Sequence, residues 1–391
     1  MRIAFIADKA WPFFLGGYEV RVAELARQLA HDNVVTVFTS FDGPARVLDG
    51  VRYIPKFPAP RLSRFSGDRS LLHSVLFSID LLKPLTELRE YDAVVIEAIP
   101  YLHLVAMSRW IRDLGPMVIL DVCEAWNSYR SRPLGAATLL GPLLRNSLKL
   151  GVRAADQVTA ISRVTAASLI KNYMVDPAKV TVVPMGLRPD WRARAPIDSA
   201  LSDVQRYDII TVGRLVRIKR HENLLRAIAL LKHKFRLRVR VAIVGDGPRR
   251  HHLSKLAQSL GIEKEIDFHG MVDPSTRNRL LASSHVFVLT SEREGFSQAT
   301  LEALASGLPV IAARPTQWEV FGVSDMIEEG KNGLFFPVDD FGSLALAIYA
   351  VLSDTELQSR LRANTMSSVT RYNWSSSAQL LLNLVKSTST L

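Results

Sequence analysis

Short apolar runs alternate with stretches of helical periodicity through the first half of the chain. The runs predict strands at Arg2–Ala7, Asn33–Thr39, Ala93–Ile96, Val118–Leu120, Gln157–Ile161 and Val180–Val183. After the first run, apolar residues recur at helical spacing and predict a helix over Tyr18–Ala30. Uninterrupted apolar strands that alternate with helices are typical of a parallel sheet with helices on both faces.

The same alternation restarts in the second half after a break. Residues Arg188–Asp203 carry two prolines, mixed charge and no apolar period, which is typical of an interdomain linker. Beyond it we expect a helix at Asn223–Lys232 and strands at Tyr207–Val212, Val239–Val244, Glu265–Phe268, Val286–Thr290 and Pro309–Ala312. The expected fold is α/β, with two Rossmann-like, doubly wound domains facing each other across a cleft. We place these domains at residues 1–190 and 204–370, and a C-terminal helix that crosses back to the first domain at 371–391.

Composition narrows the class of protein. The 391 residues are 48% apolar and 22% charged, the usual balance of a folded chain. Cys123 is the sole cysteine, which excludes an intramolecular disulfide and a cysteine-rich zinc module and favours a reducing compartment. The apolar stretch Leu134–Leu150 contains Arg145 and Lys149 and is too short to span a bilayer. We therefore expect a cytoplasmic protein, at most peripheral on the cytoplasmic face of a membrane.

The chain has a formal charge of +11, from 49 Lys and Arg against 38 Asp and Glu. A surplus of this size indicates a polyanionic partner, such as nucleic acid, nucleotide phosphates or an anionic membrane. A basic surface that merely aids solubility is the alternative. Aromatic residues do not interleave with the basic runs, so nucleic acid is the least favoured of these partners.

The turn after the strand Tyr207–Val212 carries the first candidate site. Gly213 allows close approach to the backbone, while Arg214 offers a planar fork and Lys219 a point charge that suit phosphate oxygens. Arg217 and Arg220 add to this cluster. For an isolated pair of this kind, a solvated basic face is the simpler explanation.

The segment after the strand Val286–Thr290 is more specific. A helix is predicted over Ser297–Ala305, and the unpaired N–H groups at its start form an anion site. Glu294 in the preceding loop and Glu302 on the helix suit the two ends of an elongated, hydroxyl-rich ligand. Paired carboxylates of a glycoside hydrolase are a competing interpretation, and a solvated helix face is another for Glu302.

These motifs resemble, in the same order, those of the GT4 family of retaining nucleotide-sugar glycosyltransferases, which have the GT-B fold. Glu294 and Glu302 correspond to the E-x7-E signature of that family. The other similar motifs are Gly16-Gly17 with its following helix, Val212 to Arg220, Val244 to Pro248, Phe268 to Val272 and Glu329 to Phe335. The resemblance covers nearly the whole chain, and its specificity comes from the order of the six motifs.

The resemblance implies roles for single residues. Arg214 and Lys219 are expected to bind the donor diphosphate and stabilise its charge as the glycosidic bond breaks. Glu294 is expected near the transferred sugar, and Glu302 at the ribose. Further donor contacts are expected from Gly16, Gly17, Gly213, Gly245, Gly295, Phe296 and Ser297. The implied partners are a UDP- or GDP-sugar donor and a glycan, lipid-linked or small-molecule acceptor, with no cofactor.

Metal use is expected to be absent. Many glycosyltransferases of the other common fold hold a divalent cation with a D-x-D motif, because such a cation needs clustered carboxylate oxygens. This chain contains no D-x-D. The resemblance therefore implies that the basic pair takes the place of a metal.

The chain departs from the family on the acceptor side. Many relatives carry a His after the strand that corresponds to Val118–Leu120, where this chain continues with Asp121-Val-Cys-Glu124. We expect Asp121 or Glu124 to take over the acceptor-side role of that His. His103 and the pair His251-His252 lie in settings typical of packed or solvated histidines, so no catalytic His is assigned.

The basic charge of the chain and its departures from the family pattern leave other interpretations of its function open. Basic residues mix with Leu and Phe at 61–69 and 131–149, which favours contact with anionic lipid, although ordinary packed helices explain this mixture equally well. A Rossmann dehydrogenase is disfavoured because no G-x-G-x-x-G follows the first strand. A catalytically silent protein that binds a nucleotide sugar or a membrane surface is the alternative to an enzyme.

Overall fold

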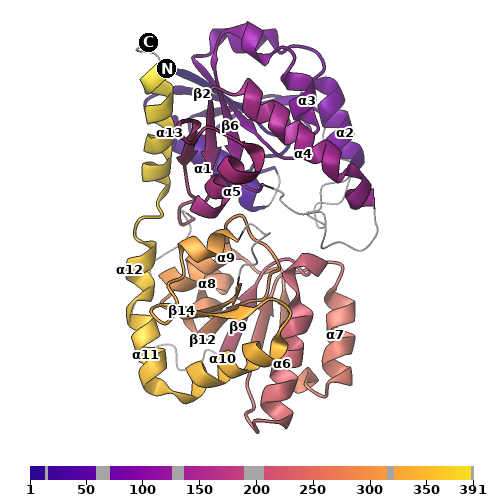
Figure 1. The fold of residues 1–391 in the computed structure, drawn as a ribbon, viewed down its shortest axis with the longest axis vertical. Helices are drawn as coiled ribbons and strands as arrows, with labels where there is room; N and C mark the ends of the chain where they lie inside the picture. The colour runs from indigo at the N-terminus through magenta and orange to yellow at the C-terminus, as the bar shows by residue number, and fades with distance from the viewer. Residues whose placement is uncertain (14–15, 59–70, 126–135, 189–206, 315–320, 389–391) are drawn as a thin grey trace. The chain divides into compact units, whose positions relative to one another are not determined.

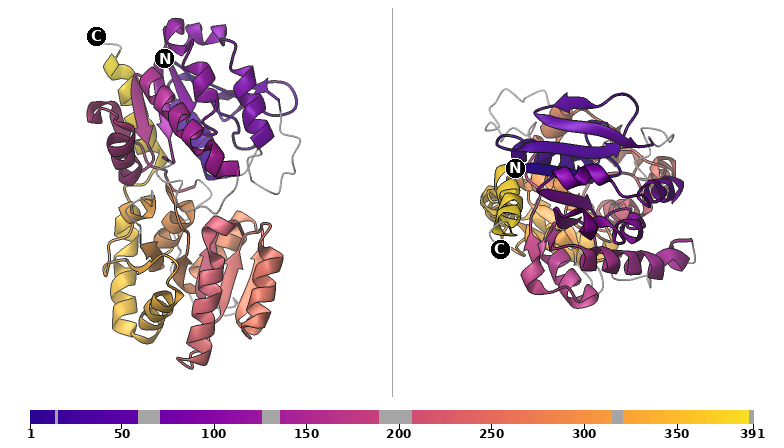
Figure 2. Two further views of the ribbon diagram at one scale, coloured as in Figure 1. Left: turned by 45° about the vertical axis from the view of Figure 1, so that its right-hand side comes forward. Right: turned by 90° about the horizontal axis from the view of Figure 1, so that it is seen from above.

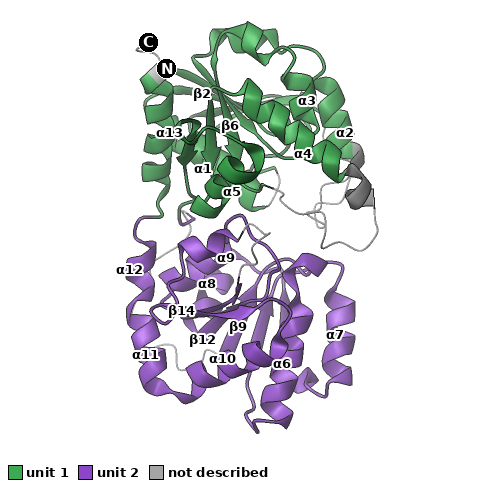
Figure 3. Cartoon of the chain, in the orientation of Figure 1, with its two compact units in different colours: residues 1–186, 372–391 green, residues 187–371 purple. Residues whose placement is uncertain are grey.

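The computed structural model describes residues 1–13, 16–58, 71–125, 136–188, 207–314 and 321–388. The chain divides into two compact units, Met1–Gly186 with Tyr372–Leu391 (unit 1) and Leu187–Arg371 (unit 2), as Figure 3 shows. Unit 1 is therefore discontinuous in sequence, whereas unit 2 is one continuous segment. The assignment of residues 1–190 and 204–370 as functional domains stays a prediction.

Unit 1 is built on an eight-stranded sheet with the order β3-β4-β2-β1-β5-β6-β7-β8. Its strands are β1 (Arg2–Ile6), β2 (Val34–Ser40), β3 (Arg46–Leu48), β4 (Val51–Phe57), β5 (Ala93–Glu97), β6 (Met117–Val122), β7 (Gln157–Ala160) and β8 (Val180–Val182). All pairs are parallel except β3 with β4. The central strands β1 and β5 are almost wholly buried because their runs of Ile, Val, Ala and Phe face helices on both sides.

Helices cover this sheet (Figure 1). They are α1 (Gly17–Leu29), α2 (Leu71–Asp80), α3 (His103–Met107), α4 (Ala136–Ala154), α5 (Arg163–Tyr173) and α13 (Trp374–Thr388). The last of these packs against α1, although the two helices lie at opposite ends of the sequence (Figure 2). No helix among the described residues has the length and apolar character needed to cross a membrane.

Unit 2 is built on a six-stranded sheet with the order β11-β10-β9-β12-β13-β14, and every pair is parallel. The strands are β9 (Tyr207–Val212), β10 (Val241–Val244), β11 (Ile266–Gly270), β12 (Ser284–Leu289), β13 (Val310–Arg314) and β14 (Gly333–Pro337). The helices are α6 (His221–His233), α7 (Arg250–Ser259), α8 (Pro274–Ala282), α9 (Gln298–Ala305), α10 (Phe341–Ser353), α11 (Thr355–Ala363) and α12 (Thr365–Val369).

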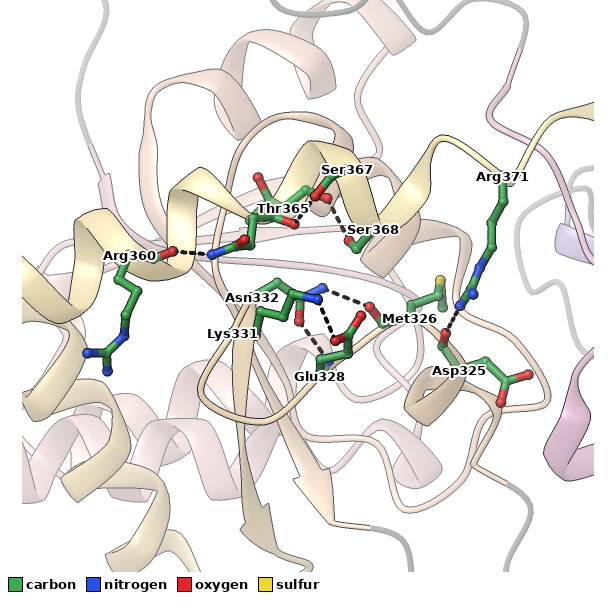
Figure 4. A network of polar contacts seen from close by, with 11 residues as sticks. Asp325, Met326, Glu328, Lys331, Asn332, Arg360, Thr365, Ser367, Ser368 and Arg371 are labelled. Carbon is green, nitrogen blue, oxygen red and sulfur yellow. Dashed lines mark hydrogen bonds and ion pairs between the residues drawn. The ribbon is translucent and has the colours of Figure 1, made fainter.

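A network of polar contacts links segments in the C-terminal part of unit 2 (Figure 4). Asn332, 1% exposed, donates from its amide to the carbonyl of Met326 at 2.9 Å and accepts from the N–H of Glu328 at 2.8 Å. Arg371, the last residue of the unit, donates to the carbonyl of Asp325. These bonds fix the turn before β14 and the end of the segment that precedes α13.

The structure confirms the α/β class with two parallel sheets. All eleven predicted strands are present, and their ends differ from the prediction by at most two residues. The prediction missed β3, β4 and β14. Each of these strands carries exposed or half-exposed positions, so no continuous apolar run marks them.

Candidate functional site

Two glycine turns are in close backbone contact at the carboxyl ends of β9 and β10 in unit 2. Gly213 follows β9 and donates to the carbonyl of Val244 at 2.9 Å. A Cβ on Gly245 would lie 2.0 Å from the carbonyl oxygen of Gly213, and Gly245 also has a φ of +129°. Only glycine fits at position 245, because both the space and the backbone conformation exclude a side chain. These turns form the edge where open α/β sheets bind ligands.

Lys219 and Glu294 meet at this edge. Lys219 ends the short 3₁₀ helix η5 (Arg217–Lys219), and its Nζ donates to Oε1 of Glu294. A Cβ on Gly213 would lie 3.8 Å from Cε of Lys219, so the lysine stem passes over the glycine turn. The two charged side chains are only 21% and 11% exposed. This ion pair is therefore partly shielded from water, which strengthens it relative to a surface pair.

The segment after β12 holds η5 in place. Thr290 donates from its hydroxyl to the carbonyl of Lys219 at 2.7 Å, and the N–H of Glu292 donates to the carbonyl of Ile218 at 3.0 Å. Further along, the carbonyl of Glu294 accepts from the N–H of Gly322 at 2.7 Å. Backbone contacts on both sides thus fix the positions from which the Lys219–Glu294 pair projects.

The other basic residues of this turn do not share one direction. Arg214 is exposed beside Gly213, and Arg217 is exposed on η5. Arg220 turns toward Glu292, with 2.8 Å between Nη2 and Oε2, and lies 3.7 Å from Asp339. The structure therefore brings Gly213, Gly245, Lys219 and Glu294 together, with Arg214 at the rim, while Arg220 points elsewhere.

The loop after Glu294 leads into α9. Gly295 is half-buried, and Phe296 is buried at 9% exposure. Ser297 caps the helix because its Oγ accepts from the N–H of Thr300 at 3.2 Å. The predicted helix over Ser297–Ala305 thus begins one residue later, at Gln298, with Ser297 as its cap.

Glu302 is buried within unit 2. It is 2% exposed, and its Oε2 lies 3.3 Å from Nε of Arg277, while Oε1 lies 4.0 Å from Nε of Arg188. The alternative of a solvated helix face is therefore wrong for Glu302. Glu294 and Glu302 each have their own cationic neighbours, so the two carboxylates are not a mutually coupled pair.

The remaining predicted site residues belong to unit 1. Gly16 is the N-cap of α1, and a Cβ there would lie 2.1 Å from Oε2 of Glu19. Gly17 has open space at the corresponding position. Glu124 is half-buried, and its carbonyl accepts from the hydroxyl of Tyr101.

Asp121 is part of a buried ion pair. Its two oxygens accept from Nε and Nη2 of Arg21, both at 2.8 Å, and Oδ1 also accepts from the hydroxyl of Thr159 at 2.6 Å. Arg21 is 0% exposed. Beside this pair, burial raises the pKa of Cys123 and of Tyr18, so both groups are uncharged at neutral pH. The acceptor-side role of Asp121 stays a prediction, and its contacts in the fold are those of a residue that holds α1 to β6.

Two titratable features were missed from the sequence. His73 on α2 has its Nε2 3.9 Å from Oδ2 of Asp8, and both side chains are buried. Asp8 closely follows the first strand, which is a signal for the carboxyl edge of the sheet, but the sequence does not link it to His73. In unit 2, burial and the charge of Lys219 lower the pKa of His221 to about 4. His103 behaves as predicted for a packed histidine, since it is 0% exposed and its Nε2 lies 2.8 Å from the carbonyl of Glu97.

Among the residues that the structure describes, no group of three or more His, Cys, Asp or Glu side chains is arranged to hold a metal ion. At the Lys219–Glu294 edge, Lys219 offers a cation for phosphate oxygens and Glu294 a carboxylate that accepts hydrogen bonds from hydroxyls.

Two family models match the chain and together cover most of it. The model for Glycosyl transferases group 1 matches residues 196–367, and that for Glycosyltransferase Family 4 matches residues 15–191. The D-inositol 3-phosphate glycosyltransferase 2 of Catenulispora acidiphila is 30% identical over 247 residues, which covers 58% of this chain and 55% of that protein. The D-inositol 3-phosphate glycosyltransferase 1 of the same organism is 29% identical over 95% of this chain and 91% of its own length. In most of the leading matches, the aligned part of the chain spans only about half the length of the curated relative.

Solved structures share the fold. Sucrose-phosphate synthase from Thermosynechococcus elongatus has a TM-score of 0.81 at 19% identity and covers 100% of this chain and 99% of its own. HepE of Anabaena, solved in complex with UDP-glucose, has a TM-score of 0.73 at 19% identity and covers 99% and 100%. Two parallel α/β units of this kind define the GT-B class of fold. Within that class, the chain belongs to the GT4-type glycosyltransferases, which confirms the resemblance seen in the sequence.

Proposed function

We propose that this protein is a retaining, metal-independent glycosyltransferase that uses a nucleotide-diphosphate sugar. The observation that carries the proposal is the shielded pair of Lys219 and Glu294 above the Gly213 and Gly245 turns. A cation beside a glycine turn, where no side chain blocks the approach of a ligand, suits a diphosphate, and a carboxylate beside it suits sugar hydroxyls. Membership in the family supplies the class of reaction.

The roles of the residues follow from their chemistry. A diphosphate that reaches Lys219 competes with Glu294 for the ammonium group, so donor binding exchanges one ion pair for another. Glu294 then accepts hydrogen bonds from the sugar, while Lys219 and Arg214 stabilise the charge that develops on the leaving diphosphate. Because two cations neutralise that charge, no divalent metal is needed. The loop Gly295-Phe296-Ser297 brings backbone N–H groups to the same edge.

Glu302 is proposed as the ribose ligand. Glu302 is buried beside two cations, with Oε2 3.3 Å from Nε of Arg277 and Oε1 4.0 Å from Nε of Arg188. An ionised carboxylate accepts two hydroxyl hydrogen bonds, which fits a ribose diol. For the base we propose uracil, since HepE, which shares the fold, was solved with UDP-glucose.

Donor binding tests the placement of the site. We expect UDP to bind the whole protein and Lys219→Ala to weaken that binding at least tenfold, because one charge-assisted contact is lost. Lys255→Ala is the matched control, since Lys255 is an exposed lysine of the same unit on α7. Titration calorimetry with UDP, GDP and ADP measures the affinities. Equal affinity of the Lys219→Ala variant and wild type contradicts the proposed site.

Transfer tests the reaction. Product formed with the best-bound donor should keep the anomeric configuration of the donor sugar, as read by proton NMR, and its rate should be unchanged by EDTA. Glu294→Gln should reduce kcat by at least tenfold, whereas Glu356→Gln, on the exposed first turn of α11, should not. Nucleotide-sugar binding without transfer or donor hydrolysis would instead support a catalytically silent binding protein.

We also propose that unit 1 contacts an anionic membrane that carries a lipid-linked acceptor. The predicted segment 61–69 lies wholly outside the described residues, and of the segment 131–149 only residues 136–149 are described. Within the described part of unit 1, α2 exposes Val75, Leu76 and Ile79 at 40%, 42% and 52%. Helices α2 and α4 both pack on α3, and exposed cations lie at Lys83, which follows α2, and at Arg145, which is on α4. Apolar side chains among cations are the pattern of an interfacial surface.

Vesicle binding tests this surface. We expect the protein to sediment with vesicles that contain an anionic lipid and to be released by raised salt, because the cations are exposed. Ile79→Ser and Lys83→Glu should each weaken binding at least threefold, while Arg52→Glu on the exposed side of β4 should not. Equal binding of the three variants contradicts the assignment to α2.

A further inference from the structure

A basic pocket lies in unit 2, and neither Lys219 nor Glu294 is among its lining residues. Its volume is about 450 Å³, which is within the usual range for a small-molecule site. The lining residues come from η5, from the start of α6, from the start of α7 and from the turn before α10: Arg217, Arg220, Glu222, Asn223, Arg226, Arg249, His252, Asp339 and Phe341. Four arginines against two carboxylates leave an excess of two positive charges in the lining.

Part of this lining is held rigidly by its own ion pairs. Glu222 accepts from Nε and Nη2 of Arg249 and lies 3.7 Å from Nε2 of His252. Burial alone would raise the pKa of Glu222, but the hydrogen bonds from Arg249 lower it overall, so the carboxylate stays charged. Arg220 is held by Glu292, which is outside the lining. Two guanidinium groups are thus oriented before any ligand binds, which lowers the entropic cost of binding.

The other two arginines carry the excess charge. Arg217 and Arg226 are exposed and make no ion pair with any residue that the structure describes. Arg226 lies over the ring of Phe341, with 5.9 Å from Cζ to the ring centroid. A guanidinium group presents a fork of N–H donors that matches phosphate oxygens. Phe341 adds an apolar face that is 36% exposed.

The backbone of the pocket is strained at two places. Arg220 has a φ of +51° and Asp339 a φ of +65°, and neither is glycine. Asp339 accepts from Nδ2 of Asn223 at 2.9 Å and faces Arg220 at 3.7 Å. Strain of this kind costs on the order of 1–3 kcal/mol per residue and gathers where a site needs a fixed geometry.

We propose that this pocket binds a phosphorylated sugar. The arginines take the phosphate, while Asp339, Asn223 and the ring of Phe341 offer acceptors, donors and an apolar face to a hydroxylated ring. The site differs from the one at Lys219, because consecutive side chains point to different partners: Lys219 to Glu294 and Arg220 to Glu292.

Calorimetry with glucose 6-phosphate as the probe tests the proposal on the whole protein. We expect measurable binding, weaker binding of inorganic phosphate and none of glucose. Arg226→Glu should weaken the binding of glucose 6-phosphate at least tenfold, because it reverses a charge on the lining. Arg360→Glu is the matched control, since Arg360 is an exposed arginine on α11 outside the pocket, and it should change the affinity less than twofold.

The Lys219→Ala variant separates this proposal from the function proposed above. It should keep its affinity for glucose 6-phosphate within twofold while losing affinity for UDP. If Arg226→Glu binds glucose 6-phosphate as well as wild type does, or if Lys219→Ala loses that binding, the pocket is not the site. Failure of UDP to bind anywhere overturns the donor site but leaves the result at Arg226 unaffected.

Discussion

Single residues at the carboxyl edge of the unit 2 sheet combine burial with charge, and His221 shows the consequence. It begins α6, two residues after Lys219, and is 3% exposed. A protonated imidazole there would lose its hydration and lie near the ammonium group of Lys219, so the pKa falls to about 4. The folded protein therefore holds His221 neutral across the range in which a free histidine titrates.

This shift predicts a pH dependence of stability. Unfolded, His221 binds a proton below about pH 6.5, whereas folded it stays neutral down to about pH 4, so protons favour the unfolded chain in this window. Stability should fall as the pH drops through the window, by about 3 kcal/mol in total. Urea unfolding at pH 7.5 and pH 5 should show a smaller loss for His221→Gln than for wild type. His251→Gln, at an exposed histidine on α7, should behave like wild type.

A loss of stability on acidification that is equal in wild type and His221→Gln would contradict the assignment. It would mean that other groups, such as carboxylates held in ion pairs, account for the whole effect. His221→Gln and His251→Gln each remove one imidazole. A difference between them in the loss of stability on acidification therefore reports the burial of His221 beside Lys219, and not the mere removal of a histidine.

Among elements, the ion pair of Arg21 with Asp121 joins α1 to β6 within unit 1. Arg21 also donates to the carbonyl of Pro184 at 3.2 Å, which adds the segment after β8 to the same junction. Removing one charge of a buried pair leaves the other without compensation. The side chain of Arg21 thus links three parts of unit 1: helix α1, strand β6 and the segment after β8.

Asp121→Asn should therefore destabilise the protein by about 3–5 kcal/mol. Glu90→Gln is the control, because Glu90 pairs with Arg2 on the surface, where the two side chains are 65% and 49% exposed, and it should cost less than about 1 kcal/mol. Urea unfolding at pH 7.5 measures both. If Asp121→Asn abolishes transfer and leaves stability unchanged, Asp121 acts on the acceptor, as the sequence predicts, and not as a structural anchor.

The sequence predicts the elements well but their contacts poorly. Strands such as Ile3 to Ile6 are visible because burial on both faces demands an unbroken apolar run. The turns at Gly213 and Gly245 are also visible, since glycine marks a close approach. By contrast, the acceptor-side prediction for Asp121 rests on its position where many relatives carry a His. Its contact with Arg21 was not predicted, because Arg21 lies 100 residues away and no spacing rule connects the two residues. Lys219 and Arg220 contact different carboxylates, and Arg220 has a left-handed φ that local sequence does not reveal.

At the scale of the whole molecule, unit 1 is completed by the last segment of the chain. On α13, Trp374, Leu381 and Val385 are buried at 4%, 1% and 1% exposure, and the helix packs on α1. A Cβ on Gly186 would lie 2.4 Å from the backbone N of Trp374, so the two ends of unit 1 that flank unit 2 lie side by side. Unit 2 is thus an insertion between adjacent points of unit 1.

This arrangement predicts which fragments fold. Residues 187–371 should unfold cooperatively by themselves, because their core is continuous in sequence. Residues 1–186 should lack a cooperative transition or aggregate, since loss of α13 exposes the apolar face of α1. Joining residue 186 to residue 372 through a short Gly-Ser linker should restore a cooperative thermal transition to unit 1, as measured by calorimetry. The linked fragment with Trp374→Ala and Leu381→Ala is the control, and it should melt lower because buried side chains are truncated. A fragment of residues 1–186 that melts as cooperatively and at the same temperature as the linked one would show that α13 is not part of the unit 1 core.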